Sequence, residues 1–205
     1  MTELLQRIIS ELGQSSLLEL AAVILAVAYL LLAVRQRIEC WYAAFVSTAI
    51  FLYIFWQVDL YMESGLQVYY LAMAVYGWWA WRHHDDLEQD LKVQTWPWHY
   101  HIAAISLIGV ATYTSGQLLA GTEQRLPYLD SFTTWGAIVT TFMVTRKVLE
   151  NWIYWLVIDA ASILLYLDRE LYFTTLLFMI YIVIIFFGFS SWLRSYRAGQ
   201  QTGKR

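Results

Sequence analysis

The sequence predicts an all-α, multi-pass membrane protein with seven transmembrane helices in a 3+1+3 arrangement of two parallel repeats. Of its 205 residues, 60% are apolar and only 14% are charged, whereas a soluble domain carries about 45–50% and about 25%. Apolar runs approaching the roughly 20 residues that cross a bilayer recur along the chain. The chain also overlays on itself without a gap when it is shifted by 111 residues.

The predicted spans alternate with polar breaks, in which both Pro97 and Pro127 fall, so we expect no proline kink within a span. Residues 1–16 are interpreted as a short amphipathic lead-in to the first helix. They lack the basic start and cleavage site of a signal peptide, so none is predicted. The seven spans are Leu17–Val34, Trp41–Val58, Leu66–Trp81, Tyr100–Leu119, Phe132–Thr145, Trp152–Leu167 and Leu171–Leu193.

Several functional classes are disfavoured by composition and motif content. Thirteen Lys and Arg against 16 Asp and Glu give a net charge of −3, which argues against nucleic-acid binding. The chain lacks the nucleotide-binding, serine-hydrolase and zinc-protease motifs, so we expect neither an enzyme nor a cofactor. The run His83-His84-Asp85-Asp86 is interpreted as a solvated acidic loop, and no metal site is predicted.

The distribution of basic residues predicts the orientation. The breaks on the N-terminal side of the membrane carry three Lys and Arg, and those on the opposite side carry ten. Cytoplasmic loops are enriched in Lys and Arg. We therefore expect the protein to lie in the inner membrane, with its N-terminus on the outside and its C-terminus in the cytoplasm.

The internal repeat predicts how the helices are grouped. Between residues 35–82 and residues 146–193, 11 of 48 positions are identical, including Trp41 with Trp152 and Gly77 with Gly188. Three helices reverse the chain direction, so one extra helix is needed to give both copies the same orientation, as in SWEET-type transporters. The predicted division is 1–16 lead-in, 17–82 first repeat, 99–119 linker helix, 130–193 second repeat and 194–205 cytoplasmic tail.

Asp159 is the strongest candidate for a functional residue, because it lies seven residues into the sixth span and a carboxylate at that depth is costly unless it serves a function. It shares a helical face with Trp152, Trp155 and Tyr166. A carboxylate beside indole rings suits a flat cationic heteroaromatic ligand, with cation–π attraction of roughly 0.5–2 kcal/mol per ring. The alternative is a structural carboxylate that hydrogen-bonds neighbouring helices.

Further candidates come from the first repeat. Thr48 is the position of the first repeat that is equivalent to Asp159, and it lies on the same helical face as Trp41. Gln67 and Tyr70 could hydrogen-bond a ribose or an amide. Trp78, Trp79 and Trp81 are interpreted as packing or membrane-interface residues, because tryptophans gather at both ends of spans.

Motifs in the third and sixth spans resemble those of the PnuC family of bacterial vitamin transporters. They are Gln67-x-x-Tyr70, Tyr76-Gly77-Trp78-Trp79-x-Trp81-Arg82 and Lys147-x-x-Glu150-Asn151-Trp152-x-x-Trp155-x-x-x-Asp159. The resemblance implies uptake of nicotinamide riboside by facilitated diffusion, with trapping by a cytoplasmic vitamin kinase. Relatives in that family carry thiamine or riboflavin. The tryptophan pair Trp152 and Trp155 matches the motif that the family uses for its substrate.

The expected function is therefore uptake of nicotinamide riboside, with thiamine or riboflavin as the alternative and a membrane receptor or scaffold without transport as the alternative of another class. The expected partners are the vitamin and the lipid bilayer, and assembly with further copies of the chain is left open. The predicted substrate-binding residues are Trp41, Thr48, Gln67, Tyr70, Asn151, Trp152, Trp155, Asp159, Tyr166 and Tyr181.

Overall fold

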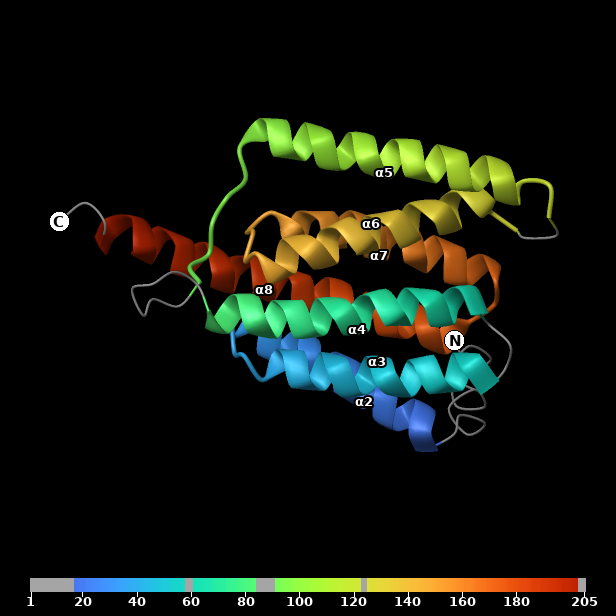
Figure 1. Ribbon diagram of the computed structural model, residues 1–205, viewed down its shortest axis with the longest axis horizontal. Coiled ribbons are helices and arrows are strands. Elements are labelled where there is room, and N and C mark those ends of the chain that lie inside the picture. The colour runs from blue at the N-terminus through green and yellow to red at the C-terminus, as the bar shows by residue number, and fades with distance from the viewer. Residues whose placement is uncertain (1–16, 58–60, 84–90, 123–124, 203–205) are drawn as a thin grey trace.

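The computed structural model describes residues 17–57, 61–83, 91–122 and 125–202, and within them the chain forms seven α-helices that run side by side (Figure 1). The predicted all-helical fold with seven helices is confirmed. The helices are α2 (Leu17–Val34), α3 (Cys40–Gln57), α4 (Tyr61–Arg82), α5 (Trp98–Leu119), α6 (Pro127–Thr145), α7 (Asn151–Asp168) and α8 (Tyr172–Thr202).

The helix ends differ most from the predicted spans in three places. Helix α4 begins at Tyr61, five residues before the predicted start at Leu66, so part of the predicted break before it is helical. Helix α6 begins at Pro127, five residues before the predicted start, so this proline belongs to a helix and not to a break. Proline suits the first helical position, because the amide N–H that it lacks would have no partner there. Helix α8 continues to Thr202, so residues 194–202 of the predicted tail are helical. The predicted lead-in at 1–16 lies outside the described residues.

Among the described helices, four are long and apolar enough to cross a membrane by length and composition: α2, α3, α5 and the Thr174–Gln201 part of α8. Helices α6 and α7 are more polar, because they bury hydroxyl, amide and carboxyl side chains inside the bundle. These are Ser131, Thr133, Thr140, Thr141, Thr145, Asn151, Asp159 and Ser162.

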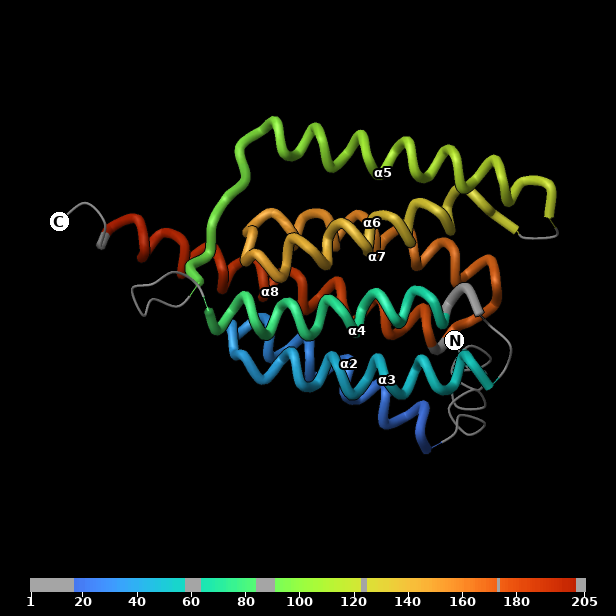
Figure 2. The backbone as a smooth tube through the Cα atoms, viewed as in Figure 1, coloured from blue at the N-terminus to red at the C-terminus, as the bar shows by residue number. Residues whose placement is uncertain are grey.

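The packing of the helices follows the sequence repeat. Helix α3 packs between α2 and α4, and α7 packs between α6 and α8. The two groups meet through α2 against α8 and through α4 against α6. A shift of 111 residues maps α2 onto α6 and α4 onto α8. The contact of α2 with α8 is therefore equivalent to the contact of α6 with α4. Helix α5 lies along the edge of the bundle beside α6 (Figures 1 and 2).

The turns that follow the first helix of each group are also equivalent. Gln36 and Lys147, which are 111 positions apart, have φ angles of 55° and 50°. A residue in the left-handed backbone conformation commonly ends a helix, and that residue is usually glycine. After Gln36 the backbone N–H of Arg37 donates to the carbonyl of Leu32 over 3.0 Å, and the corresponding bond after Lys147 has the same length.

Each repeat packs one tryptophan against one glycine. The ring of Trp41 on α3 lies against Gly77 on α4, and the ring of Trp152 on α7 lies against Gly188 on α8. A β-carbon at either glycine would fall well inside van der Waals distance of that ring. The small residue thus lets the indole seat directly on the backbone of the next helix.

Two indole hydrogen bonds join the repeats. Trp81 donates its Nε1–H to the carbonyl of Val144 over 3.3 Å, and Trp192 donates to the carbonyl of Ala33 over 2.9 Å. Donor and acceptor in one pair correspond to donor and acceptor in the other after the shift of 111. These two indole contacts between the repeats therefore follow the same symmetry as the helix packing.

The tryptophan cluster, defined as Trp41, Trp81, Trp152 and Trp192, occupies the end of the bundle where α3 and α7 begin. Trp41 meets Trp81 edge-on at 5.3 Å between ring centroids, and Trp152 meets Trp192 in the same way at 5.4 Å. Trp81 and Trp192 complete the chain of rings at 6.2 Å. All four side chains are buried, so the cluster closes this end of the bundle.

A linker clip, defined as residues 91–96, holds the segment before α5 to the turn between α6 and α7. Gln94 forms an isolated parallel bridge with Val148. Its backbone N–H donates to Lys147 over 3.1 Å, and its carbonyl accepts from Leu149 over 2.8 Å. Leu91 and Val93 are buried in the same core as the tryptophan cluster.

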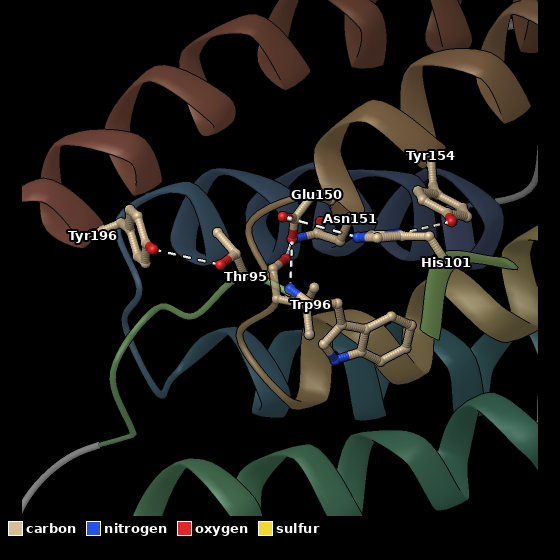
Figure 3. Close-up of polar contacts among 8 residues, drawn as sticks. Thr95, Trp96, His101, Glu150, Asn151, Tyr154 and Tyr196 are labelled. Carbon is tan, nitrogen blue, oxygen red and sulfur yellow. Dashed lines mark hydrogen bonds and ion pairs between the residues drawn. The ribbon is translucent and has the colours of Figure 1, made fainter. Parts of the chain in front are cut away.

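Polar side chains extend this attachment into the start of α5 (Figure 3). The Glu150 carboxylate accepts the backbone N–H of Trp96 over 3.3 Å, and its other oxygen lies 3.9 Å from His101. His101 Nδ1 also pairs with the hydroxyl of Tyr154 at 3.0 Å. The linker helix is therefore tied to the second repeat at this end.

Candidate functional site

A cavity of about 750 Å³ lies among the helices, and all seven contribute to its wall. Its volume falls within the range of about 300–1,000 Å³ that is typical of small-molecule sites. At one end its lining includes Asp130 and Arg169 near the start of α6 and the end of α7, and at the other it reaches Trp41 and Trp152 of the tryptophan cluster. The cavity thus runs along the bundle axis between the repeats.

Nine of the ten predicted substrate-binding residues line this cavity. The exception is Gln67, which is half-buried on α4, where the lining residues are Leu66, Tyr70 and Ala74. Contact with substrate stays a prediction for all ten residues. The nine are Trp41, Thr48, Tyr70, Asn151, Trp152, Trp155, Asp159, Tyr166 and Tyr181.

Asp159 is buried on α7, with 3% of its surface exposed. Tyr70 and Tyr181, which are equivalent positions of the two repeats, both lie within electrostatic reach of its carboxylate. Asp159 therefore projects into the space between the repeats. Its counterpart Thr48 lines the same cavity from α3.

The charges along the cavity are unequal in number. Among the described lining residues, one has a basic side chain, Arg169, and its guanidinium pairs with the carboxylate of Asp130 over 3.1 Å. Asp159 is the second carboxylate of the lining. The described wall therefore contains one more acid than base, with Asp159 as the acid away from the ion pair.

Several buried polar atoms of the cavity wall have no hydrogen-bond partner in the described structure. The amide nitrogen of Asn151 donates to the carbonyl of Val148. This bond fixes the amide orientation and leaves Oδ1 as an unpaired acceptor. Unpaired buried polar groups are costly, so a ligand or water is expected to meet them. The atoms are Trp41 Nε1, Ser131 Oγ, Asn151 Oδ1 and Trp152 Nε1.

Two further parts of the cavity wall were not predicted from the sequence. One is Tyr29 on α2, whose ring lies 6.0 Å from that of Trp41. The other is a group of hydroxyl side chains on α6, which its unusual content of Ser and Thr for an apolar span could have revealed. The second group comprises Ser131, Thr133, Thr134 and Thr141.

Neither the interfacial tryptophans nor the histidine run forms a second site in the described residues. Trp79 is half exposed, whereas Trp81 is buried in the tryptophan cluster. No group of three metal-ligating side chains is found among the residues that the structure describes. His83 stacks on Trp79 at 6.0 Å, and His84, Asp85 and Asp86 lie outside the described residues.

Seven helices around an axial cavity with a buried carboxylate and aromatic walls define a multi-pass membrane protein built to hold a small molecule. The sequence model of the family described as "Nicotinamide mononucleotide transporter" matches residues 16–194, and the chain belongs to this family. This confirms the family resemblance seen in the third and sixth spans. The chain is accordingly a membrane vitamin transporter and not an enzyme.

Curated relatives and a solved structure agree with this assignment. The chain is 27% identical to "Nicotinamide riboside transporter PnuC" of Escherichia coli, over 81% of this chain and 80% of the relative. It is also 27% identical to "Riboflavin/roseoflavin transporter RibM" of Streptomyces davaonensis, over 85% and 84%. The fold matches the "Crystal structure of the Vitamin B3 transporter PnuC" with a TM-score of 0.74 and 18% identity, covering 95% of this chain and 88% of that one.

Proposed function

We propose that the chain carries nicotinamide riboside across the bacterial inner membrane by facilitated diffusion. A cytoplasmic kinase then phosphorylates the vitamin and so prevents its return. The relative from Escherichia coli is named for this substrate. The cavity volume and the aromatic residues beside Asp159 suit a flat ring joined to a sugar.

The observation that carries the proposal is the excess acid in the cavity. A carboxylate at membrane depth costs on the order of 2.5–3.5 kcal/mol on insertion scales unless it finds a partner. The pyridinium ring of nicotinamide riboside is permanently cationic, so it can balance Asp159. Because Arg169 is already paired with Asp130, the described wall offers no spare base for a phosphate, which favours the nucleoside over its nucleotide.

Two other vitamins are the alternatives. Thiamine also carries a permanent cationic ring and would use Asp159 in the same way. Riboflavin is favoured by the relative from Streptomyces davaonensis, but its flavin is neutral and would leave Asp159 without a counter-charge. A receptor or scaffold without transport is the alternative of another class, and it would bind vitamin without flux.

A ligand panel followed by an uptake assay tests the proposal. Nicotinamide riboside, thiamine and riboflavin are added separately to purified protein, because a ligand that binds the native state raises its melting temperature. We expect the largest rise with nicotinamide riboside. Uptake of the labelled vitamin into proteoliposomes without ATP is then expected. Binding without uptake would support the receptor, and a larger shift with another vitamin would reassign the substrate.

A further inference from the structure

The two repeats differ most clearly along one stripe of the cavity. At some equivalent positions the residue is identical, as for Trp41 and Trp152 and for Tyr70 and Tyr181. Every fourth residue on α7, by contrast, is a large or polar side chain whose counterpart on α3 is smaller or uncharged. The pairs along this stripe are Asn151 with Cys40, Trp155 with Ala44, and Asp159 with Thr48.

Residues four apart lie on one face of a helix, and both stripes reach the same cavity. Asn151, Trp155 and Asp159 line it from α7, and Ala44 and Thr48 line it from α3. The α7 stripe provides an indole for stacking and a carboxylate for charge, which are the groups that a cationic ring requires. The α3 stripe provides neither, so the aromatic ring is assigned to the α7 side.

The α3 side has features of a different subsite. Ala44 leaves open the volume that the indole of Trp155 fills in the other repeat. Thr48, one turn further along, brings a hydroxyl that can donate and accept. Trp41, one turn before Ala44, lines the same side of the cavity, and its indole N–H is unpaired just as that of Trp152 is in the other repeat. Open space beside a hydroxyl group, the two features that distinguish the α3 stripe from the α7 stripe, suits a hydroxylated, non-aromatic group.

We propose that Trp41, Ala44 and Thr48 form a subsite for the hydroxyl-bearing part of the substrate, a ribose or ribityl chain, and that Ala44 sets its size. The subsite rests on the proposed function, because it assumes a vitamin whose ring occupies the α7 side. It makes Ala44 a specificity-determining residue, and Thr48 a hydrogen-bonding partner of the substrate's hydroxyl groups.

The experiment compares ligands that share a ring but differ in the hydroxylated chain. Affinity of purified protein is measured for nicotinamide riboside against 1-methylnicotinamide, and for riboflavin against lumiflavin. The variants are Ala44→Leu, which fills the space, and Thr48→Val, which removes the hydroxyl at similar volume. Ala72→Leu is the matched control, because Ala72 is exposed on α4 and does not line the cavity.

Ala44→Leu is expected to weaken the affinity for the vitamin with the hydroxylated chain at least tenfold. The affinity for the matching ligand without that chain is expected to stay within about twofold. Thr48→Val is expected to weaken the chain-bearing vitamin about three- to tenfold, as for the loss of one hydrogen bond. The melting temperature without ligand is recorded for each variant, and Thr48→Val keeps the test decisive if Ala44→Leu does not fold.

The possible outcomes separate the two proposals. Equal losses for both ligands of a pair, or no loss in a folded variant, would overturn the subsite. Binding of riboflavin but not of nicotinamide riboside would overturn the proposed substrate, while selective loss of riboflavin over lumiflavin in the variants would still support the subsite. Failure of wild-type protein to bind any of the vitamins would overturn both proposals.

Discussion

The indole N–H of Trp192 donates to the backbone carbonyl of Ala33 over 2.9 Å, which joins the last of the described helices, α8, to the first, α2. The equivalent bond from Trp81 to Val144 joins the third helix to the fifth of the chain's seven described helices. An interface in which the same contact occurs twice, once from each side, is the hallmark of two-fold symmetry. Here the two-fold relationship is internal and relates two parts of one chain.

Replacing Trp192 by Phe keeps an aromatic ring but removes the N–H. The carbonyl of Ala33, a residue that is only 1% exposed, would then lose its side-chain donor. Because that carbonyl still accepts the backbone N–H of Gln36, we expect a loss of about 0.5–1.5 kcal/mol in the free energy of unfolding, read as a lower melting temperature in detergent. Trp81→Phe should cost less, because its bond is longer, at 3.3 Å. Unchanged melting of both variants would show that these bonds contribute nothing to stability.

Gly188→Ala should destabilise the protein, because the new methyl group would overlap the ring of Trp152. Overpacking of this kind typically costs 1–3 kcal/mol. Gly199→Ala on the same helix is the matched control, since open space surrounds Gly199 and alanine is the better helix former by about 1 kcal/mol. The measurement is the melting temperature. If both variants behave alike, the contact between tryptophan and glycine is not tight.

Asp159→Asn preserves size and hydrogen bonding but removes the charge. We expect the folded variant to bind a cationic vitamin roughly 1–2 kcal/mol more weakly, about 5–30-fold in Kd. Trp155→Ala should cost a similar amount through lost stacking, and Trp155→Phe less. Melting temperature and Kd are measured on the same preparation. Lower stability with normal affinity would instead identify Asp159 as a structural residue and would favour a neutral substrate.

Ten basic residues lie on the side of the membrane that holds the C-terminus, and three lie on the opposite side. This excess predicts that the loop between α4 and α5 and the C-terminus face the cytoplasm. A reporter active only in the cytoplasm should therefore function when it is fused after Arg205. A second reporter, active only in the periplasm, should be silent at the same position. The reverse pattern would invert the proposed orientation.

Uptake is expected to stop when the free vitamin is equal on both sides. The described cavity wall holds Asp159 and the ion pair of Asp130 with Arg169, which is a short series for a proton relay. Labelled vitamin in proteoliposomes without kinase should equilibrate, with or without an imposed pH gradient. Accumulation above the outside concentration, driven by that gradient, would mean that transport is coupled.

The helices and much of the cavity wall could be predicted, because hydrophobic runs define spans and helical spacing defines faces. Asp159 and its tryptophans were found because they share one face of one helix. Tyr29 and the hydroxyl groups of α6 were not, since periodicity does not say which face of one helix meets which face of another. The repeat overcomes this limit at equivalent positions, as where Asp159 on α7 indicates Thr48 on α3.

The linker clip left no pattern to detect. It depends on one backbone bridge, between Gln94 and Val148, and on one carboxylate, Glu150, that accepts from a backbone N–H. A single bridge has no alternating strand signal, because such a signal needs four or more residues. The start of α6 was misplaced for a related reason: Pro127 was assigned to a break, although the first turn of a helix accepts proline.

The position of the clip in the sequence also sets an order of events while the chain is being made. Gln94 leaves the ribosome more than fifty residues before Lys147 and Leu149, the residues that hold it. At about 5–20 residues per second, the segment ahead of α5 therefore waits several seconds for its partners. Ala33 waits longer still for Trp192. The first half of the protein must persist in the bilayer unfinished, because the contact of α2 with α8 forms only as the final helix is completed.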